Sequence, residues 1–220
     1  MIRSYKEEQE LKRQRKLQAE LERLEGMLVY EREYRPLGVV CGIDEVGRGP
    51  LAGPVVAGAV ILPEDCQILY LNDSKKLTEH RRELLSEEIM EKAVAVGLGV
   101  VSQERIDEIN ILQATYEAMR EAVGKLDPQP EILLNDAVTI PGLSQRQIPI
   151  IKGDAKSQSI AAASVVAKVT RDHMMIALDE AYPQYGFASN KGYGSAAHMA
   201  ALREYGPCPL HRRTFIRNIC

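Results

Sequence analysis

The sequence predicts an α/β protein in which a mixed five-stranded sheet is flanked by helices and preceded by a helical extension. Five short runs rich in Val, Ile, Leu and Ala are typical of strands. Longer segments with apolar residues at helical spacing lie between the later runs. Hairpin-like spacing joins the first runs and helical segments join the later ones, so we do not expect a purely parallel sheet.

The predicted elements follow one another along most of the chain. The strands are GVVCGID, GPVVAGAVIL, AVAVGLGVVS, EILLND and QIPIIKG. Thr78 is the expected N-cap of a helix before the third strand. A second helix is expected over residues 104–125, and a long one over residues 155–181, whose alanines and serines allow it to lie close to the sheet. The first two helices are expected to bury Leu84, Leu85, Ile89 and Met90, and Ile106, Ile109, Leu112, Tyr116, Met119 and Val123, respectively.

Residues 1–35 predict a charged amphipathic helix that precedes the main domain, residues 36–220. Pro36–Gly38 ends this helix. Charges of both signs are typical of a solvated face. We therefore favour a helix that packs its leucines on the main domain over one that contacts a partner or a nucleic-acid backbone. These leucines are Leu17, Leu21, Leu24 and Leu28.

Composition limits the classes of protein to consider. The 220 residues are 45% hydrophobic and carry a net charge of -3, so a nucleic-acid partner would need a local basic patch. The four cysteines form no CxxC pair and show no zinc-site spacing, which favours free thiols in a reducing cytosol. The charged N-terminus is unlike a signal peptide, and no apolar run approaches the ~18 residues of a membrane span. We expect a cytoplasmic protein without a membrane segment.

Four acids follow predicted strands. Asp44 and Glu45 end the first strand, Asp136 ends the fourth, and Asp154 follows the fifth. Ligands of α/β sheets gather where strand ends and the following loops meet. Mg²⁺ and Mn²⁺ prefer oxygen ligands, so these acids predict a divalent-metal site if they converge.

Each acid also has a simpler interpretation. Asp154 could be the N-cap of the following helix, and Asp136 could be a turn residue. Side chains alternate across a regular strand, so Asp44 and Glu45 can share a face only if the strand ends or bends there. The glycines of the next loop would allow such an end. An apolar strand, then an acid, then a Gly or a helix start occurs three times, and this repetition favours a site.

The loop GRGPLAG leaves two interpretations open. It is no Walker A loop, and it is a poor dinucleotide fingerprint because a strand follows it. Glycines around Arg48 suit close approach of backbone N–H groups to a phosphate or sugar. A tight hairpin turn with an exposed Arg is the alternative. Basic residues beside the Gly-containing loops favour a phosphate-rich partner: Lys75, Lys76, Lys152, Lys168, Arg171, Lys191, His211, Arg212 and Arg213.

Five segments resemble those of bacterial ribonuclease HII and occur in that family's order between Gly42 and Phe215. They are GIDEVGRGPLAGPVVAGAVIL, NDSKKL, KGDAKSQSIAAASVVAKVTRD, NKGYG and LHRRTF. The resemblance implies an RNase H-like fold, a monomer, and cleavage of the RNA strand of RNA/DNA hybrids that depends on Mg²⁺ or Mn²⁺. The related ribonuclease HIII has an extra N-terminal domain, for which residues 1–35 are too short, and a glutamate as its fourth acid.

The resemblance also implies roles for individual residues. The family's metal ligands and catalytic residues fall on Asp44, Glu45, Asp136 and Asp154. Its Gly-Arg-Gly motif, its substrate-sensing tyrosine and its phosphate contacts fall on the substrate-binding residues Gly47, Arg48, Gly49, Lys75, Tyr193, His211 and Arg212. The sequence departs from the family at Asn135, where an aliphatic strand residue is usual, and it stops soon after HRRTF.

Phosphodiester hydrolysis needs a nucleophilic water, a neutralised phosphate and a stabilised leaving oxygen, and two metal ions can supply all three. Asp44 is expected to bridge the ions, with Asp136 and Glu45 on one side and Asp154 on the other. The resemblance implies 5′-phosphate and 3′-hydroxyl products.

The 2′-hydroxyl marks a ribonucleotide. Residues 47–49 and Tyr193 are expected to read it, so that the enzyme cuts 5′ of a single ribonucleotide in duplex DNA. A catalytically silent nucleic-acid-binding module and another RNase H-like nuclease, such as a DNA exonuclease or a recombinase, are the alternatives.

Overall fold

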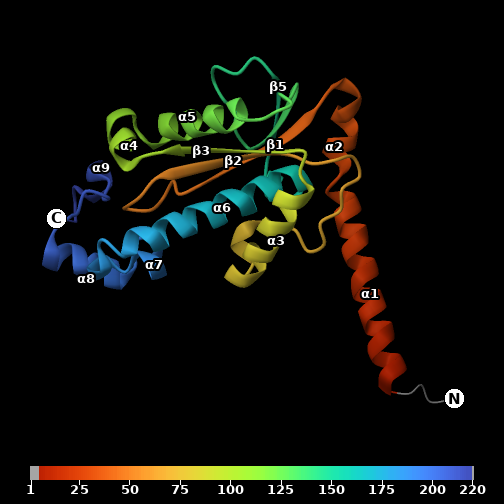
Figure 1. Ribbon diagram of the computed structural model, residues 1–220, viewed down its shortest axis with the longest axis horizontal. Coiled ribbons are helices and arrows are strands. Elements are labelled where there is room, and N and C mark those ends of the chain that lie inside the picture. Colours follow the sequence, from red (N-terminus) through yellow and green to blue (C-terminus); the bar gives the residue numbers. More distant parts are fainter. Residues whose placement is uncertain (1–4, 220) are drawn as a thin grey trace.

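A computed structural model describes residues 5–219 and contains the predicted mixed sheet (Figure 1). The strand order is β3-β2-β1-β4-β5. β1 pairs antiparallel with β2, and β2 with β3, whereas β1–β4 and β4–β5 are parallel pairs. All five predicted strands are confirmed: β1 (Val40–Val46), β2 (Val55–Ile61), β3 (Ala95–Val101), β4 (Ile132–Asp136) and β5 (Arg146–Ile150).

Helices cover both faces of the sheet. The long helix α6 (Gln158–Asp179) packs on β1 and β2, and α5 (Ile111–Gly124) packs on β2 and β3 from the opposite side (Figure 1). A Cβ on Gly42 would lie 2.1 Å from the carbonyl carbon of Ser159 in α6. The sheet therefore needs glycine where α6 approaches it, and small residues on both elements bring the helix close to the end of β1.

One predicted helix is two helices in the structure. The segment 104–125 forms α4 (Gln103–Ile109) and α5, separated by Asn110 at φ 69°. The Asn110 side chain accepts hydrogen bonds from the N–H groups of Leu112 and Gln113, so it caps α5. With ψ 162°, the backbone of Asn110 is outside the helical regions, so α4 ends there and a new helix begins.

The helix before β3 begins as predicted. The Thr78 hydroxyl accepts a hydrogen bond from Arg81 N–H at the start of α3 (Glu79–Lys92). Its buried face is narrower than expected, because Leu85 and Ile89 are buried whereas Leu84 and Met90 are exposed. In α5, Leu112 is likewise exposed rather than buried.

The N-terminal extension contains two helices in place of one. These are α1 (Tyr5–Gly26) and α2 (Val29–Tyr34), and a short 3₁₀ turn, η1 (Arg35–Leu37), follows. Leu24 and Leu28 are buried, but Leu17 is exposed because the first half of α1 projects away from the body (Figure 1). The leucine stripe therefore packs on the main domain only at its C-terminal end.

The buried carboxylate of Glu31 joins the extension to the start of α6. It accepts hydrogen bonds from the Ser157 hydroxyl at 2.6 Å and from Ser159 N–H at 2.9 Å. The N–H of Gln158 also donates to the Met27 carbonyl. A carboxylate at a helix N-terminus is favourable because it satisfies free N–H groups and faces the positive end of the helix dipole. The extension thus helps to fix α6.

The C-terminal segments pack together at the far end of α6 (Figure 1). They include η4 (Pro183–Tyr185), α7 (Phe187–Asn190), α8 (Ala196–Tyr205) and α9 (Arg213–Ile216). The loop after β1 bonds to this region, because Leu51 N–H donates to the Gly192 carbonyl and Gly53 N–H to the Leu210 carbonyl. Cys41, Cys66 and Cys208 are free thiols, as predicted, and Cys220 lies outside the described residues. Within residues 5–219, no helix combines the length and apolar character that crossing a membrane requires.

Candidate active site

Asp44 and Glu45 lie within β1 rather than after it. They pair with Gly58 and Ala57 of β2, and the strand continues to Val46. The strand therefore ends directly before Gly47, as the glycines predict, and it stays regular through both acids. Asp44 lies on the face covered by α6, where it bonds to Ser164, and strand alternation places Glu45 on the other face. Both still line one pocket of about 230 Å³, because β1 ends one residue later.

The electrostatics of this pair are unfavourable for two carboxylates. Asp44 is 8% exposed. Burial, and next the charge of Glu45, raise the pKa of Asp44, although a hydrogen bond with Ser164 opposes the shift. Burial also raises the pKa of Glu45, and the nearby guanidinium of Arg48, 3.3 Å away, opposes that shift. The site therefore holds negative charge that the protein compensates only in part.

Asp136 and Asp154 complete the group of strand-end acids, which we call the carboxylate edge. The Asp136 side chain accepts a hydrogen bond from Gly153 N–H at 2.7 Å, which ties the end of β4 to η3 (Gly153–Ala155). Burial raises the pKa of Asp154, and the charges of Asp73 and Asp136 raise it further. Ser157, not Asp154, is the N-cap of α6, because its hydroxyl accepts from Ile160 N–H. The capping interpretation of Asp154 is therefore wrong.

The carboxylate edge is a single electrostatic neighbourhood but not a preformed chelate. Asp44, Glu45 and Asp154 each interact with the charge of Asp136. In the part of the chain that the structure describes, no three His, Cys, Asp or Glu side chains are grouped so that they could hold one metal ion. The donor set consists of carboxylate oxygens, which suits Mg²⁺ or Mn²⁺ and not a softer ion.

Asn135 fixes the loop that follows Asp136. It is fully buried, and its amide N–H₂ donates to the Gln147 side-chain oxygen at 2.9 Å and to the Val138 carbonyl at 3.2 Å. Gln147 in turn bonds both backbone groups of Ile140. The unusual polar residue thus replaces apolar packing with a hydrogen-bond network, and β4 keeps its register beside β1 and β5.

The two glycines around Arg48 have different structural requirements. Gly47 has φ 93°, and a Cβ there would lie 2.3 Å from Nε of Arg171, so the fold itself requires glycine. A Cβ on Gly49 would meet nothing closer than 3.8 Å, where the ring of Tyr193 begins. Arg48, Gly49 and Tyr193 line the same pocket as Asp44, and Tyr193 is 44% exposed. The space over Gly49 is therefore open toward the pocket.

Lys75 also lines this pocket, from the 3₁₀ turn η2 (Ser74–Lys76). Its charge lowers the pKa of both Glu45 and Asp154, although burial dominates each shift. Asp73 caps the turn by accepting from Lys75 N–H. Lys75 thus provides an exposed positive charge beside the carboxylate edge, where a phosphate group can reach it.

His211 and Arg212 occupy positions that correct the prediction of phosphate contacts. Arg212 is 0% exposed and His211 is 1% exposed, so neither side chain reaches the solvent. Arg212 donates to backbone carbonyls of the loop after β1, the nearest being the Gly47 carbonyl at 2.6 Å. Both residues therefore support the loop from inside the protein.

His211 belongs to a chain of hydrogen bonds that ends on Tyr193. Cys208 N–H donates to Nδ1 of His211, so Nε2 of His211 carries its proton and donates to Nε2 of His198 at 3.0 Å. Nδ1 of His198 then donates to the Tyr193 carbonyl at 2.8 Å. Both imidazoles are neutral in this arrangement. The chain holds the backbone of the tyrosine that lines the pocket.

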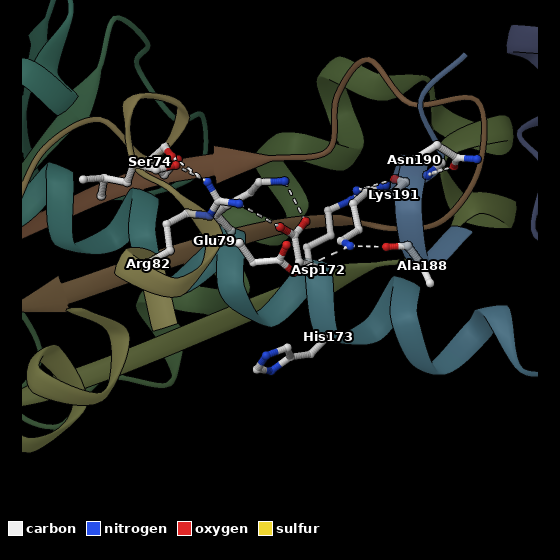
Figure 2. Close-up of polar contacts among 12 residues, drawn as sticks. Ser74, Glu79, Arg82, Asp172, His173, Ala188, Asn190 and Lys191 are labelled. Carbon is white, nitrogen blue, oxygen red and sulfur yellow. Dashed lines mark hydrogen bonds and ion pairs between the residues drawn. The ribbon is translucent and has the colours of Figure 1, made fainter. Parts of the chain in front are cut away.

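Three polar pocket residues were not assigned to the site from the sequence: Ser74, Ser164 and Lys168, of which Lys168 was noted only as one of the basic residues beside the loops. The hydroxyls of Ser74 and Ser164 lie 3.0 Å apart. Lys168 bonds Asp172 at 2.6 Å, and Asp172 also pairs with Arg82, which donates to the Ser74 carbonyl (Figure 2). The signal was the i, i+4, i+7 spacing of Ser164, Lys168 and Arg171, which places polar groups on one face of α6.

The fold and the carboxylate edge define an RNase H-like nuclease. A solved structure of ribonuclease H2 from Pyrococcus horikoshii superposes with a TM-score of 0.68 at 30% identity, over 82% of this chain and 96% of that chain. The family model described as Ribonuclease HII matches residues 41–218. The chain belongs to the ribonuclease HII family, enzymes that cleave the RNA strand of RNA/DNA hybrids.

Curated members of the ribonuclease HII family align with nearly the whole chain. Ribonuclease HII of Lachnoclostridium phytofermentans is 64% identical over 94% of this chain and 82% of its own length. Ribonuclease HII of Bacillus subtilis is 57% identical over the same shares. The resemblance seen in the sequence motifs is thus confirmed.

Proposed function

We propose that this chain is a metal-dependent endoribonuclease that cuts hybrids and also cuts 5′ of single ribonucleotides embedded in duplex DNA. The products are a 5′-phosphate and a 3′-hydroxyl. The observation that supports this proposal best is one pocket that brings Asp44 and Glu45 together with the backbone of Arg48–Gly49 and with Tyr193. The carboxylates that would support cleavage thus lie next to groups that can contact a ribose.

Asp44, Glu45, Asp136 and Asp154 are the residues that would hold Mg²⁺ or Mn²⁺. When bound, two such ions supply an activated water and neutralise charge on the phosphate. Burial raises the pKa values of Asp44, Glu45 and Asp154, and the charges of neighbouring carboxylates raise them further. A cation would therefore relieve both the repulsion and the cost of burial. The carboxylates must turn toward one another to share it.

Selection of RNA requires groups other than the acids. The 2′-hydroxyl is both a donor and an acceptor, so its recognition needs polar groups in fixed places. Exposed N–H groups at Arg48 and Gly49 can donate, and Arg48 and Lys75 can bind adjoining phosphates. The half-exposed ring of Tyr193 can pack against the next sugar, where a 2′-hydroxyl would clash. This pairing favours a ribose followed by a deoxyribose.

The substrates are accordingly RNA/DNA hybrids and DNA duplexes that contain ribonucleotides, and we propose that the protein acts on them as a cytoplasmic monomer. The direct test is a DNA duplex with one internal ribonucleotide, incubated with and without Mg²⁺ or Mn²⁺. Metal-dependent cutting on the 5′ side of the ribonucleotide is expected, with no cutting of the same all-DNA duplex. Binding without cutting under every condition would instead indicate a silent nucleic-acid-binding module.

Tyr193→Ala tests the recognition step. We expect slower cutting at a single ribonucleotide relative to a long hybrid, because a positioning contact is lost while the metal ligands remain. The control is the melting temperature without substrate. A variant that is less stable but cuts both substrates in the wild-type ratio would assign Tyr193 to loop packing alone.

A further inference from the structure

Two buried arginines, which we call the guanidinium core, lie beneath the loop 47–54. Arg212 comes from the segment before α9, and Arg171 comes from α6. Both are 0% exposed. Arg171 donates to the carbonyls of Ala52, Pro54 and Lys191. Arg212 donates to the carbonyls of Gly47, Arg48, Gly53 and Pro54 at 2.6–3.2 Å.

The bonds of Arg212 determine the direction of the loop's N–H groups. In a planar trans peptide, the C=O of one residue and the N–H of the next point in opposite directions. The carbonyls of Gly47 and Arg48 point inward to the guanidinium, at 2.6 and 3.0 Å. The N–H groups of Arg48 and Gly49 therefore point away from it, and both residues are exposed and line the pocket.

These two N–H groups are unused by the fold. Among residues 5–219, no hydrogen bond has Arg48 N–H or Gly49 N–H as its donor. By contrast, the N–H groups of Leu51 and Gly53, later in the same loop, donate to carbonyls of the C-terminal region. The loop thus keeps its free donors at the two positions that face the pocket.

We propose that Arg212 is a positioning residue for ribonucleotide recognition, because it holds the Gly47 and Arg48 carbonyls inward and so aims the Arg48 and Gly49 N–H groups at the ribose. This inference rests on the proposed function and assigns its specificity to a side chain that substrate does not reach. Only arginine offers enough donors in a rigid fork to hold four carbonyls at once. A lysine keeps the charge but has three donors on a single flexible nitrogen.

Arg212 also remains charged at neutral pH, as this role requires. Burial and the neighbouring Arg171 lower the pKa of Arg212 to about 9, which leaves the guanidinium protonated near pH 7. Its plane also lies over the ring of Phe215, 5.1 Å from the ring centroid. The ring and the carbonyls together fix the orientation of the fork.

The test is Arg212→Lys, measured on a DNA duplex with one ribonucleotide. We expect kcat to fall about 10- to 100-fold because the donors are misdirected, while the Mg²⁺ concentration for half-maximal activity stays at the wild-type value. The matched control is Ile216→Ala, which removes a buried side chain from the same C-terminal cluster but leaves Arg212 and its carbonyl partners unchanged. Its kcat should stay at the wild-type value at a temperature where both variants are folded. A wild-type kcat in folded Arg212→Lys would overturn the inference.

A second measurement uses the wild-type protein and does not depend on the variant's folding. Without divalent metal, so that nothing is cut, the amide NMR signals of Arg48 and Gly49 should shift when the ribonucleotide-containing duplex binds. The same all-DNA duplex should shift them far less. If both duplexes leave these signals unmoved, the inference is wrong even when the wild type cleaves. If the wild type cuts no ribonucleotide substrate at all, the proposed function fails instead.

Discussion

The carboxylate edge and the guanidinium core lie on opposite sides of one loop, yet they differ in how far their buried charges are compensated. At the edge, Asp44 and Glu45 are buried beside each other, and the charges of Arg48 and Lys75 oppose that of Glu45. In the core, Arg171 and Arg212 are buried beside each other, but carbonyl groups surround both guanidinium groups. The carboxylate edge compensates its buried charge only in part, whereas the guanidinium core pairs its charged groups with hydrogen-bond acceptors.

This difference indicates that the carboxylate edge is suited to binding a ligand, whereas the guanidinium core stabilises the loop 47–54. Buried cations are tolerated when every donor finds an acceptor, and removing such a partner is costly. Carboxylates that repel each other lower stability, so they are expected where a ligand supplies the missing charge. The loop 47–54 joins the two regions, because its carbonyls face the core and its free N–H groups face the edge.

The largest expected effect comes from Asp44→Asn. Cleavage should fall at least about 100-fold, because a carboxylate that would hold the divalent cation is lost. Without metal, the melting temperature should stay level or rise, since a neutral amide removes repulsion with Glu45. Asp136→Asn should behave alike, as its amide oxygen can still accept from Gly153. Near-normal Mg²⁺-dependent turnover in either variant would contradict the proposal that the carboxylate edge binds the metal ions.

The second prediction concerns pH and the buried histidine pair that supports the same loop region. Burial lowers the pKa of His211 to about 4, and the adjacent His198 and Arg213 also oppose its protonation. The unfolded chain takes up this proton near pH 6.5 and the folded chain only near pH 4, so stability is lost as pH falls through that window. The loss should reach about 3 kcal/mol from this residue.

Urea unfolding of Asp44→Asn at pH 7 and at pH 4.5 measures this loss. The variant is used because acidification relieves the raised-pKa carboxyl of Asp44 in the wild type and would oppose the trend. Protonation of His211 places a second proton on Nδ1, which in the neutral ring accepts the hydrogen bond from Cys208 N–H at 3.0 Å, so that bond would be lost. Equal or greater stability at pH 4.5 would show that the pair tolerates protonation.

The smallest effect comes from comparing Gly47→Ala with Gly49→Ala. Gly47→Ala should cost about 1–3 kcal/mol of stability, because its Cβ would overlap Arg171 and its φ is 93°. Gly49→Ala should leave stability within about 0.5 kcal/mol, because its Cβ fits in the free protein. It should instead raise KM for a ribonucleotide-containing duplex. Thermal melts and steady-state kinetics on both variants check these two effects. A stable Gly47→Ala variant with a raised KM, together with an unstable Gly49→Ala variant with a normal KM, would reverse the roles of the two glycines.

Local sequence signals predicted much of the fold and the location of the site. The alternation of apolar runs and helical segments identified all five strands, and Thr78 was correctly predicted as a cap. The break at Asn110 was missed, because no Gly or Pro marks it and its conformation depends on how α4 and α5 pack. Spacing along the chain also left a capping role open for Asp154, which the structure gives to Ser157.

The sequence by itself determined which acids stand at or near the strand ends and which glycines flank Arg48, because strand periodicity, caps and turns depend on residues close together in the chain. Only the tertiary structure decided that Arg212 points inward. Its guanidinium meets Gly53, 159 residues earlier in the chain, and a charged residue near a glycine-rich loop gives no local sign of burial. Whether a cation binds phosphate or backbone depends on which carbonyls the fold brings to it, and that is decided by long-range packing.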